Sequence, residues 1–311
     1  MVGKLLVLGA AFGVAGSFLA AQNAGLTAEQ IVSKNVAARG GLKAWHAVQT
    51  ISESGKMGAG GDSRESQAAN PAVKRPGKNA APMTSSPRLA QEAQLPFTLD
   101  LERPRRMRLE IQFKGQTALQ VYDGSNGWKV RPYLNRMEVE SFTEDELRKA
   151  ALQQELDGPL VDCDAKGTRV ELEGSEKVED KDTYRLKLTM KDGHSVHVWI
   201  DARTFLEAKM EGTPRRLDGK EHPVEIYYRD YRAVDGLQIP FLLETRVLPA
   251  ANLAKGVRQA NFPPEKIVIE KVQINPKLDA ALFTKPVIET ASLSKPQQPN
   301  KPQQLSKPQQ H

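Results

Sequence analysis

The strongest constraint on the fold is an alternation of apolar and polar residues between positions 97 and 111. Two runs of this kind flank a corner at Arg103-Pro104-Arg105. Residues two apart on a strand point to the same face, so the alternation predicts an antiparallel hairpin with one apolar face. That face carries Phe97, Leu99, Leu101, Met107, Leu109 and Ile111. The pattern returns around the turn Asp192-Gly193, at Tyr184, Leu186, Leu188, Met190, Val196, Val198 and Ile200.

Further strands are expected on both sides of these hairpins, separated by turn residues that tolerate positive φ. They are expected near residues 50–57, 117–121, 128–130, 170–172, 206–210, 224–231, 238–247 and 266–274. In the last of them the apolar parity shifts between Ile269 and Val272, which predicts a β-bulge. Bulges help a sheet to curl, so the sequence predicts a curled antiparallel sheet.

Three helices are expected to accompany this sheet, over residues 27–39, 42–48 and 143–156. The two longer ones each begin with a capping box, formed by Thr27 with Gln30 and by Thr143 with Glu146. The third helix carries its apolar residues on one side and is therefore suited to cover a sheet.

The first residues have the pattern of a cleaved secretory signal. Lys4 precedes an apolar, glycine-rich run that ends in small residues at Ala20-Ala21. The alternative is an uncleaved anchor, although the run is short for a membrane span. Cys163 is the sole cysteine and lies far from this leader, so a lipid-anchored N-terminus is not expected. We therefore expect a soluble mature protein.

The formal charge of +6 lies outside the predicted fold. Its sources are the leader, a Gly-, Ala-, Ser- and Pro-rich stretch over 58–95, and a tail that repeats Lys-Pro-Gln-Gln. The stretch is expected to be disordered because it offers too little apolar surface to order itself. The remaining core is neutral, so nucleic acid is not an expected partner.

The residue patterns that mark catalysis or metal binding are absent from this sequence. It has no nucleophile elbow, His-Glu-x-x-His pair, phosphate loop or dinucleotide fingerprint. His194 and His197 have opposite strand parity and are not expected to share a metal. Asp162 and Asp164 share a parity, but solvated charges are the commoner explanation. Their charges are expected to raise the pKa of Cys163 between them, which argues against a nucleophile. We predict a non-enzymatic protein without a cofactor.

The apolar face is then the candidate site, because a sheet of this extent must hide it. One alternative is an ordinary core filled by the protein's own helices. The other is a half-barrel whose helices form a lid over a pocket for acyl chains. The expected lining residues are Leu99, Leu101, Met107, Leu109, Ile111, Leu119, Val121, Trp128, Leu186, Leu188, Val196 and Val198.

The order of elements resembles the outer-membrane lipoprotein-sorting (LolA-like) family. The resemblance is carried by Ala-Arg-Gly-Gly-Leu at 38–42, Asp-Gly-Pro-Leu-Val-Asp at 157–162, and the strand ends at 199–204 and 231–240. It implies an incomplete antiparallel β-barrel with helices across its concave face, and a periplasmic carrier of lipid-modified proteins. The arginine that latches the lid in such carriers has no assigned counterpart in this sequence.

The sequence therefore predicts a periplasmic carrier that shelters acyl chains of a lipoprotein or lipid. The alternative is an envelope interaction or stress-sensing protein with a closed core, in transient contact with membrane or protein partners. The expected domains are a signal peptide (1–21), a LolA-like half-barrel (22–293) that contains the 58–95 insertion, and a disordered tail (294–311).

Overall fold

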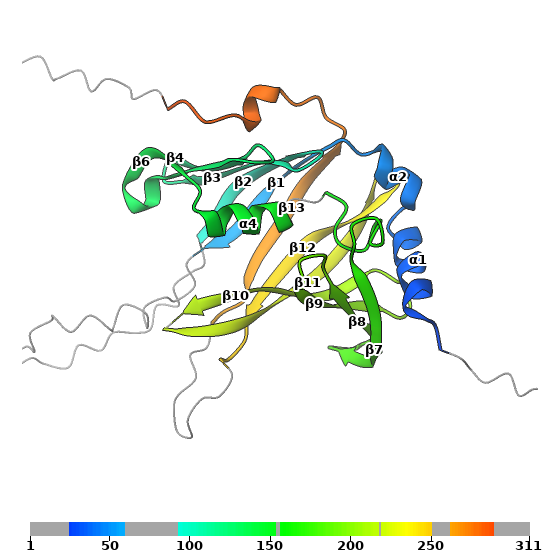
Figure 1. Ribbon diagram of the computed structural model, residues 1–311. Helices are drawn as coiled ribbons and strands as arrows, with labels where there is room; N and C mark the ends of the chain where they lie inside the picture. The colour runs from blue at the N-terminus through cyan, green and yellow to red at the C-terminus, as the bar shows by residue number, and fades with distance from the viewer. Residues whose placement is uncertain (1–24, 60–92, 154–155, 218, 251–261, 289–311) are drawn as a thin grey trace, which may run out of the picture.

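The computed structural model describes residues 25–59, 93–153, 156–217, 219–250 and 262–288 (Figure 1). The expected leader, the tail and most of the 58–95 insertion lie outside these residues. The helices are α1 (Ala28–Ala38), α2 (Leu42–Ala47) and α4 (Glu144–Gln153), with 3-10 helices η1 (Pro132–Leu134) and η2 (Ala280–Phe283). The strands are β1 (Thr50–Ala59), β2 (Ala93–Glu102), β3 (Arg106–Phe113), β4 (Gln116–Tyr122), β5 (Gly127–Arg131), β6 (Arg136–Ser141), β7 (Arg169–Val178), β8 (Lys181–Thr189), β9 (Ser195–Asp201), β10 (Glu207–Leu217), β11 (Lys220–Val234), β12 (Leu237–Val247) and β13 (Glu265–Ile274).

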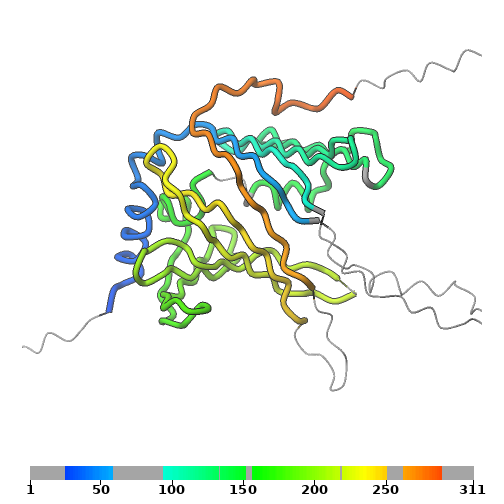
Figure 2. Tube along the Cα trace, turned by 180° about the vertical axis from the view of Figure 1, so that it is seen from behind, coloured from blue at the N-terminus to red at the C-terminus, as the bar shows by residue number. Residues whose placement is uncertain are grey.

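The strands form one antiparallel sheet of 13, in the order β6-β5-β4-β3-β2-β1-β13-β12-β11-β10-β9-β8-β7. The first and last strands pair in its middle, so two meanders join at β1 and β13 (Figure 2). The sheet curls but does not close, because β6 and β7 stand at opposite ends of the strand order. This confirms the predicted fold class, which is mainly β with an incomplete barrel.

The hairpin that dominates the sequence is β2 and β3. Its register places Leu99 opposite Leu109 and Leu101 opposite Met107. Residues directly opposite each other in an antiparallel pair share a face of the sheet. The predicted apolar face of this hairpin is therefore confirmed.

The predicted bulge lies where β13 pairs with β1. Ser54 is opposite Lys271 and Gly55 is opposite Ile269, so Glu270 is the extra residue. Glycine is required at position 55 because a Cβ there would run into the carbonyl oxygen of Val268. The shift in parity seen in the sequence thus marks a real kink in the central strand pair.

The ends of the predicted insertion need a correction. β1 and β2 remain paired out to Gly58 with Gln94 and Ala59 with Ala93. Residues 58–59 and 93–95 therefore belong to strands, and the boundaries drawn at 58 and 95 are too wide. Small residues at these strand ends gave no alternation from which the pairing could be predicted.

Helices α1 and α4 lie on the concave side of the sheet (Figure 1). Both predicted capping boxes are present, since Thr27 and Gln30, and Thr143 and Glu146, exchange hydrogen bonds at the helix starts. The described part of the third helix ends at Gln153 rather than Leu156. Among the described residues, no helix has the length and apolar character that crossing a membrane requires.

The segment over residues 276–288, which contains η2, covers part of the opposite, convex side (Figure 1). Arg108 on β3 donates a hydrogen bond from Nη1 to the carbonyl of Leu282, at 3.1 Å. Ile288 packs against Leu119 and Val121 of β4. Strands β3 and β4 are therefore covered in part on their convex side as well.

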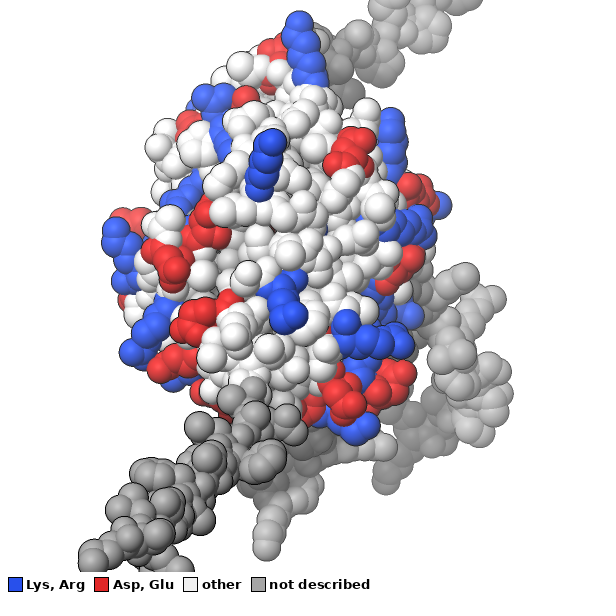
Figure 3. Space-filling model, turned by 90° about the vertical axis from the view of Figure 1, so that its right-hand side faces the viewer, with Lys and Arg blue, Asp and Glu red and all other residues white. Residues whose placement is uncertain are grey.

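Charges of both signs are intermixed on the side of the molecule shown in Figure 3, which lies at the right of Figure 1. Lysine and arginine side chains stand among aspartate and glutamate side chains around a largely uncharged middle. This side of the described chain therefore has no extended basic patch of the kind that a phosphate backbone attracts.

Candidate functional site

The concave face brings together nine of the twelve predicted lining residues. Leu99, Leu101, Met107 and Leu109 pack beneath Leu147 and Ala150 of α4. Ile111, which lies opposite Phe97, has the same parity. Leu186, Leu188, Val196 and Val198 pack beneath Ala28 and Ile31 of α1. The two hairpins identified in the sequence thus face the same side of the curled sheet.

Three predicted lining residues face the convex side, and their assignment to the pocket is wrong. The register of β3 and β4 places Leu119 opposite Glu110 and Val121 opposite Arg108. Trp128 lies opposite Val121 on β5 and shares that face. These residues pack with Val130, Val139 and Ile288 instead. On β4 the more apolar set of side chains, Leu119 and Val121, faces outward, where Ile288 of the 276–288 segment packs against it, and the concave face carries the exposed Gln120. Alternation alone therefore pointed to the wrong face.

The side chains of the concave face differ in how far they are exposed. Leu186 and Leu188 are 0% exposed and Val198 is 1% exposed, so α1 already fills this part of the concave face. In the middle of the sheet the aliphatic side chains are only partly buried. We call this group the central strip, and it consists of Met57, Leu99, Leu109, Ile111, Leu243 and Ile267. The strip is a part of the concave face where aliphatic side chains stay partly exposed.

Glu53 lies in the same face as the central strip. On β1 it stands between Leu99 of β2 and Val272 of β13, its neighbours directly across the two strand pairs. Burial raises the pKa of its carboxyl to about 7 from the ordinary 4.5. A signal was present in the sequence, because Glu53 has the parity of the apolar residues Ile51 and Met57.

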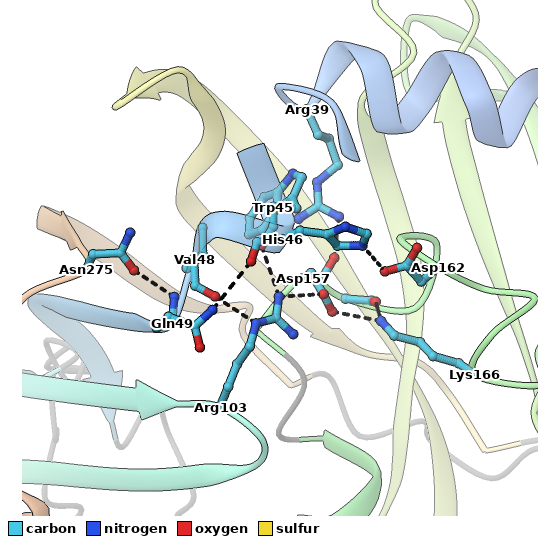
Figure 4. Close-up of polar contacts among 11 residues, drawn as sticks. Arg39, Trp45, His46, Val48, Gln49, Arg103, Asp157, Asp162, Lys166 and Asn275 are labelled. Atoms are coloured by element: carbon cyan, nitrogen blue, oxygen red, sulfur yellow. Dashed lines mark hydrogen bonds and ion pairs between the residues drawn. The ribbon is translucent and has the colours of Figure 1, made fainter. Parts of the chain in front are cut away.

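A cluster of charged side chains fastens the helices to the rim of the sheet (Figure 4). We call it the rim cluster, and it consists of Arg39, Arg103, Asp157 and Lys166. The Asp157 side chain is 3% exposed and accepts hydrogen bonds from Arg103 Nη2 at 2.8 Å and from Lys166 Nζ at 2.7 Å. Burial alone acts to raise the pKa of Asp157, but these two cations outweigh it and the pKa lies below 3.8.

Arg103 extends from the corner between β2 and β3 to the end of α2. Its Nε donates to the carbonyl of Val48 at 2.7 Å, and its Nη2 donates to that of Trp45 at 3.1 Å. These carbonyls belong to the C-terminal turn of α2, where a helix has acceptors without partners of its own. One side chain thereby joins the hairpin, the helix and Asp157.

Arg39 joins the end of α1 to the same cluster. Its Nη1 donates to the backbone carbonyl of Asp157 at 2.8 Å and lies 3.4 Å from a carboxylate oxygen of Glu207. Its guanidinium also stacks over the ring of Trp45, 4.5 Å from the centroid. Arg39 lies in the Ala-Arg-Gly-Gly-Leu stretch, and Asp157 begins the Asp-Gly-Pro stretch. The sequence presented both stretches as helix ends, without a sign that they meet.

The polar residues considered for catalysis have structural partners. His46 Nε2 lies 2.5 Å from Asp162 Oδ2. Asp162 and Asp164 lie in a turn rather than on a strand, so the shared strand parity does not apply to them. His197 bonds Glu211 and Glu173 at 2.8 and 3.1 Å, on the outer face of β9. Cys163 is partly buried, and burial together with the charge of Asp164 raises its thiol pKa, as predicted. Within the described ranges no group of three or more His, Cys, Asp or Glu side chains is placed to hold a metal ion.

No protein-family model matches this chain, and no curated protein matches it. Similar solved structures include a LolA superfamily protein, NE2245, from Nitrosomonas europaea, with 15% identity over 84% of this chain and 99% of that one, at a TM-score of 0.47. A DUF1329 family protein from Desulfovibrio piger has 13% identity over 83% of this chain and 97% of that one, at 0.48. A putative outer membrane lipoprotein-sorting protein domain from Vibrio parahaemolyticus has 12% identity over 83% of this chain and 96% of that one, at 0.46. Two of the three carry the description of the family that the sequence resembles.

Proposed function

We propose that this protein is a periplasmic carrier that shelters the acyl chains of a lipid-modified protein or a lipid on its concave face. The observation that supports it most is the central strip. Six aliphatic side chains from five strands lie side by side and are only partly buried. Apolar surface left open inside a curled sheet is typical of a ligand site.

The strip has the chemistry that an acyl chain requires. Each methylene moved from water onto such a surface contributes about 0.8 kcal/mol. A chain of about fifteen methylenes therefore gains on the order of 10 kcal/mol before the costs of association are subtracted. Non-directional binding of this kind needs no catalytic group.

The rim cluster supports a covered rather than an open site. It holds α1, α2 and the segment after α4 against the edge of the hairpin through Asp157 and Arg103. The ends of α1 and α2 are therefore fixed to the sheet, so they can stay in place over the concave face.

The test uses two neighbouring residues of β13 that face opposite sides. Ile267 lies in the central strip, whereas Val268 lies on the convex face and is 40% exposed. Ile267→Glu places a charge where the acyl chain is expected to lie, and we expect at least about a tenfold loss in affinity for a fluorescent fatty acid. Val268→Glu is the matched control and should bind as the unaltered protein does.

A second experiment looks for a native ligand that stays bound to the protein during purification. The protein purified without denaturant is extracted with organic solvent, and the extract is compared by mass spectrometry with that of a matched control protein. Acyl lipid at about one per protein would name the cargo class. An empty protein that also takes up neither a fluorescent fatty acid nor a fluorescent acyl ester would contradict the proposal.

One observation favours the alternative of an interaction protein with a closed core. Under α1 the concave face is filled, since Leu186, Leu188 and Ile200 are all 0% exposed. If the same holds for the central strip in solution, Ile267→Glu will lower stability without changing any lipid binding. Melting curves of both glutamate variants separate these outcomes.

A further inference from the structure

Glu53 differs from several other carboxylates of the sheet, which have cationic partners. On the convex face Glu244 is bonded to Arg246 and Glu225 is bonded to Lys209. Glu53 makes no hydrogen bond or ion pair within the described part of the chain, and its cross-strand neighbours are the aliphatic Leu99 and Val272. A partly buried polar group without a partner is costly and points to a partner from outside.

Charged groups on β5, at the end of α1 and at the β2–β3 corner, which border the concave face, have partners. Lys129 of β5 is paired with Glu146 of α4, Arg39 with Glu207 of β10, and Arg103 with Asp157. Burial is the cause of the raised pKa of Glu53, which lies at about 7. Near neutral pH a large share of the molecules therefore carries this side chain as a neutral carboxyl group, which is a hydrogen-bond donor.

We infer that Glu53, in its protonated form, donates a hydrogen bond to the ester or amide carbonyl of an acyl chain bound along the central strip. This rests on the proposed carrier function and specifies the ligand class. An ester carbonyl accepts the hydrogen bond without burying a charge. A free fatty-acid anion would bring a second carboxylate to an apolar site in which Glu53 has no cation beside it.

A cationic amphiphile is the competing partner, because an ammonium group could pair with the ionised carboxylate. The aliphatic neighbours argue against it. Burying both an ammonium and a carboxylate costs the hydration of each, and the two donors left on the ammonium would face Leu99 and Val272. When the protonated Glu53 binds an ester carbonyl, both groups are neutral and no charge loses its hydration. An acyl ester therefore fits this site better.

The experiment uses the whole mature protein and three ligands whose chains have the same total number of carbon atoms. These are monopalmitoylglycerol, palmitate and hexadecylamine, titrated at pH 6 and pH 8.5, on either side of the pKa of about 7. Calorimetry in two buffers of different ionisation enthalpy reports whether a proton is taken up on binding. The variant is Glu53→Gln, whose amide keeps a donor but does not titrate.

For the unaltered protein we expect the affinity for monopalmitoylglycerol to fall about tenfold or more from pH 6 to pH 8.5, because the donor is lost as Glu53 ionises. Binding at pH 8.5 should take up a proton, and palmitate should bind more weakly than the ester. In Glu53→Gln the ester affinity should be the same at both pH values, with no proton uptake. Glu270→Gln, on the exposed bulge of the neighbouring strand, is the control and should keep the pH dependence.

Two results would overturn this inference while leaving the carrier function in place. One is ester binding that is equally tight at both pH values in the unaltered protein and in Glu53→Gln. The other is hexadecylamine binding that strengthens as the pH rises and is lost in Glu53→Gln, which would assign the ionised carboxylate to a cation. If none of the three ligands binds either protein, the proposed carrier function fails as well.

Discussion

Glu53 and Asp157 show how far the same functional group depends on its neighbours. Both carboxyls are withdrawn from water, and burial acts to raise the pKa of each. Asp157 has two cations within hydrogen-bond distance and stays ionised. Glu53 has aliphatic neighbours and is protonated to a large extent near neutral pH. The first carboxyl therefore holds the structure together, and the second is free to meet a ligand.

The pKa of Glu53 predicts a stability that depends on pH. A carboxyl whose pKa rises on folding, here to about 7 from 4.5, favours the folded state fully below 4.5. That contribution is lost as the pH rises through 7. Glu53→Gln removes the cost of the buried charge, so we expect it to raise the free energy of unfolding by roughly 2 kcal/mol at pH 8.5. Urea unfolding should show no such gain at pH 4.

The lowered pKa of Asp157 predicts the opposite dependence of stability on pH. Its pKa is lowered on folding, so its contribution is present above 3.8 and is lost as the pH falls through the folded-state value. Asp157→Asn leaves Arg103 and Lys166 without their carboxylate, and we expect a loss of roughly 2 to 4 kcal/mol at pH 7. The difference from the unaltered protein should shrink below pH 3.8. The exposed Asp164→Asn should change the unfolding midpoint little at either pH.

At the scale of the elements, the pairing of β1 with β13 depends on one glycine. A methyl group at position 55 would collide with the carbonyl oxygen of Val268. We expect Gly55→Ala to lower the free energy of unfolding by roughly 2 to 4 kcal/mol, because backbone rather than a flexible side chain must move. The neighbouring Ser54→Ala should change it by less than about 0.5 kcal/mol. Equal effects of the two substitutions would contradict the close approach.

The sequence predicted the individual strands and turns better than it predicted the contacts between elements that are distant along the chain. Alternation identified the β2–β3 hairpin, and the parity shift near Glu270 identified the bulge, because both are local consequences of which way side chains point. The prediction that Leu119 and Val121 of β4 face the concave side was wrong because their outer face is covered by residues 276–288, which lie far along the chain. The rim cluster was missed for the same reason, since Arg39 and Asp157 are separated by 118 positions.

The open sheet of the protein carries apolar side chains on both of its faces, and the two faces are covered differently. On the concave side α1 and α4 pack on the two halves of the sheet, and the central strip, of which Leu99 and Leu109 also contact the cluster under α4, is only partly buried. On the convex side Leu119 and Val121 are buried, and Ile288 of the 276–288 segment packs against them. A ligand is therefore expected to find accessible apolar surface on the concave side.

The position of β13 in the middle of the sheet also bears on how the chain acquires its structure. Ile51 pairs with Ile274, so the seam that joins the two meanders links strands more than 200 positions apart. Each meander is built from neighbours in sequence and can form early, whereas the seam requires a long loop to close. A ribosome or a translocation channel releases residues 265–274 late, so the central strip, which includes Ile267, is assembled only after nearly the whole chain has emerged. Until then the two halves would expose their apolar faces, and that interval is when the protein is most open to aggregation.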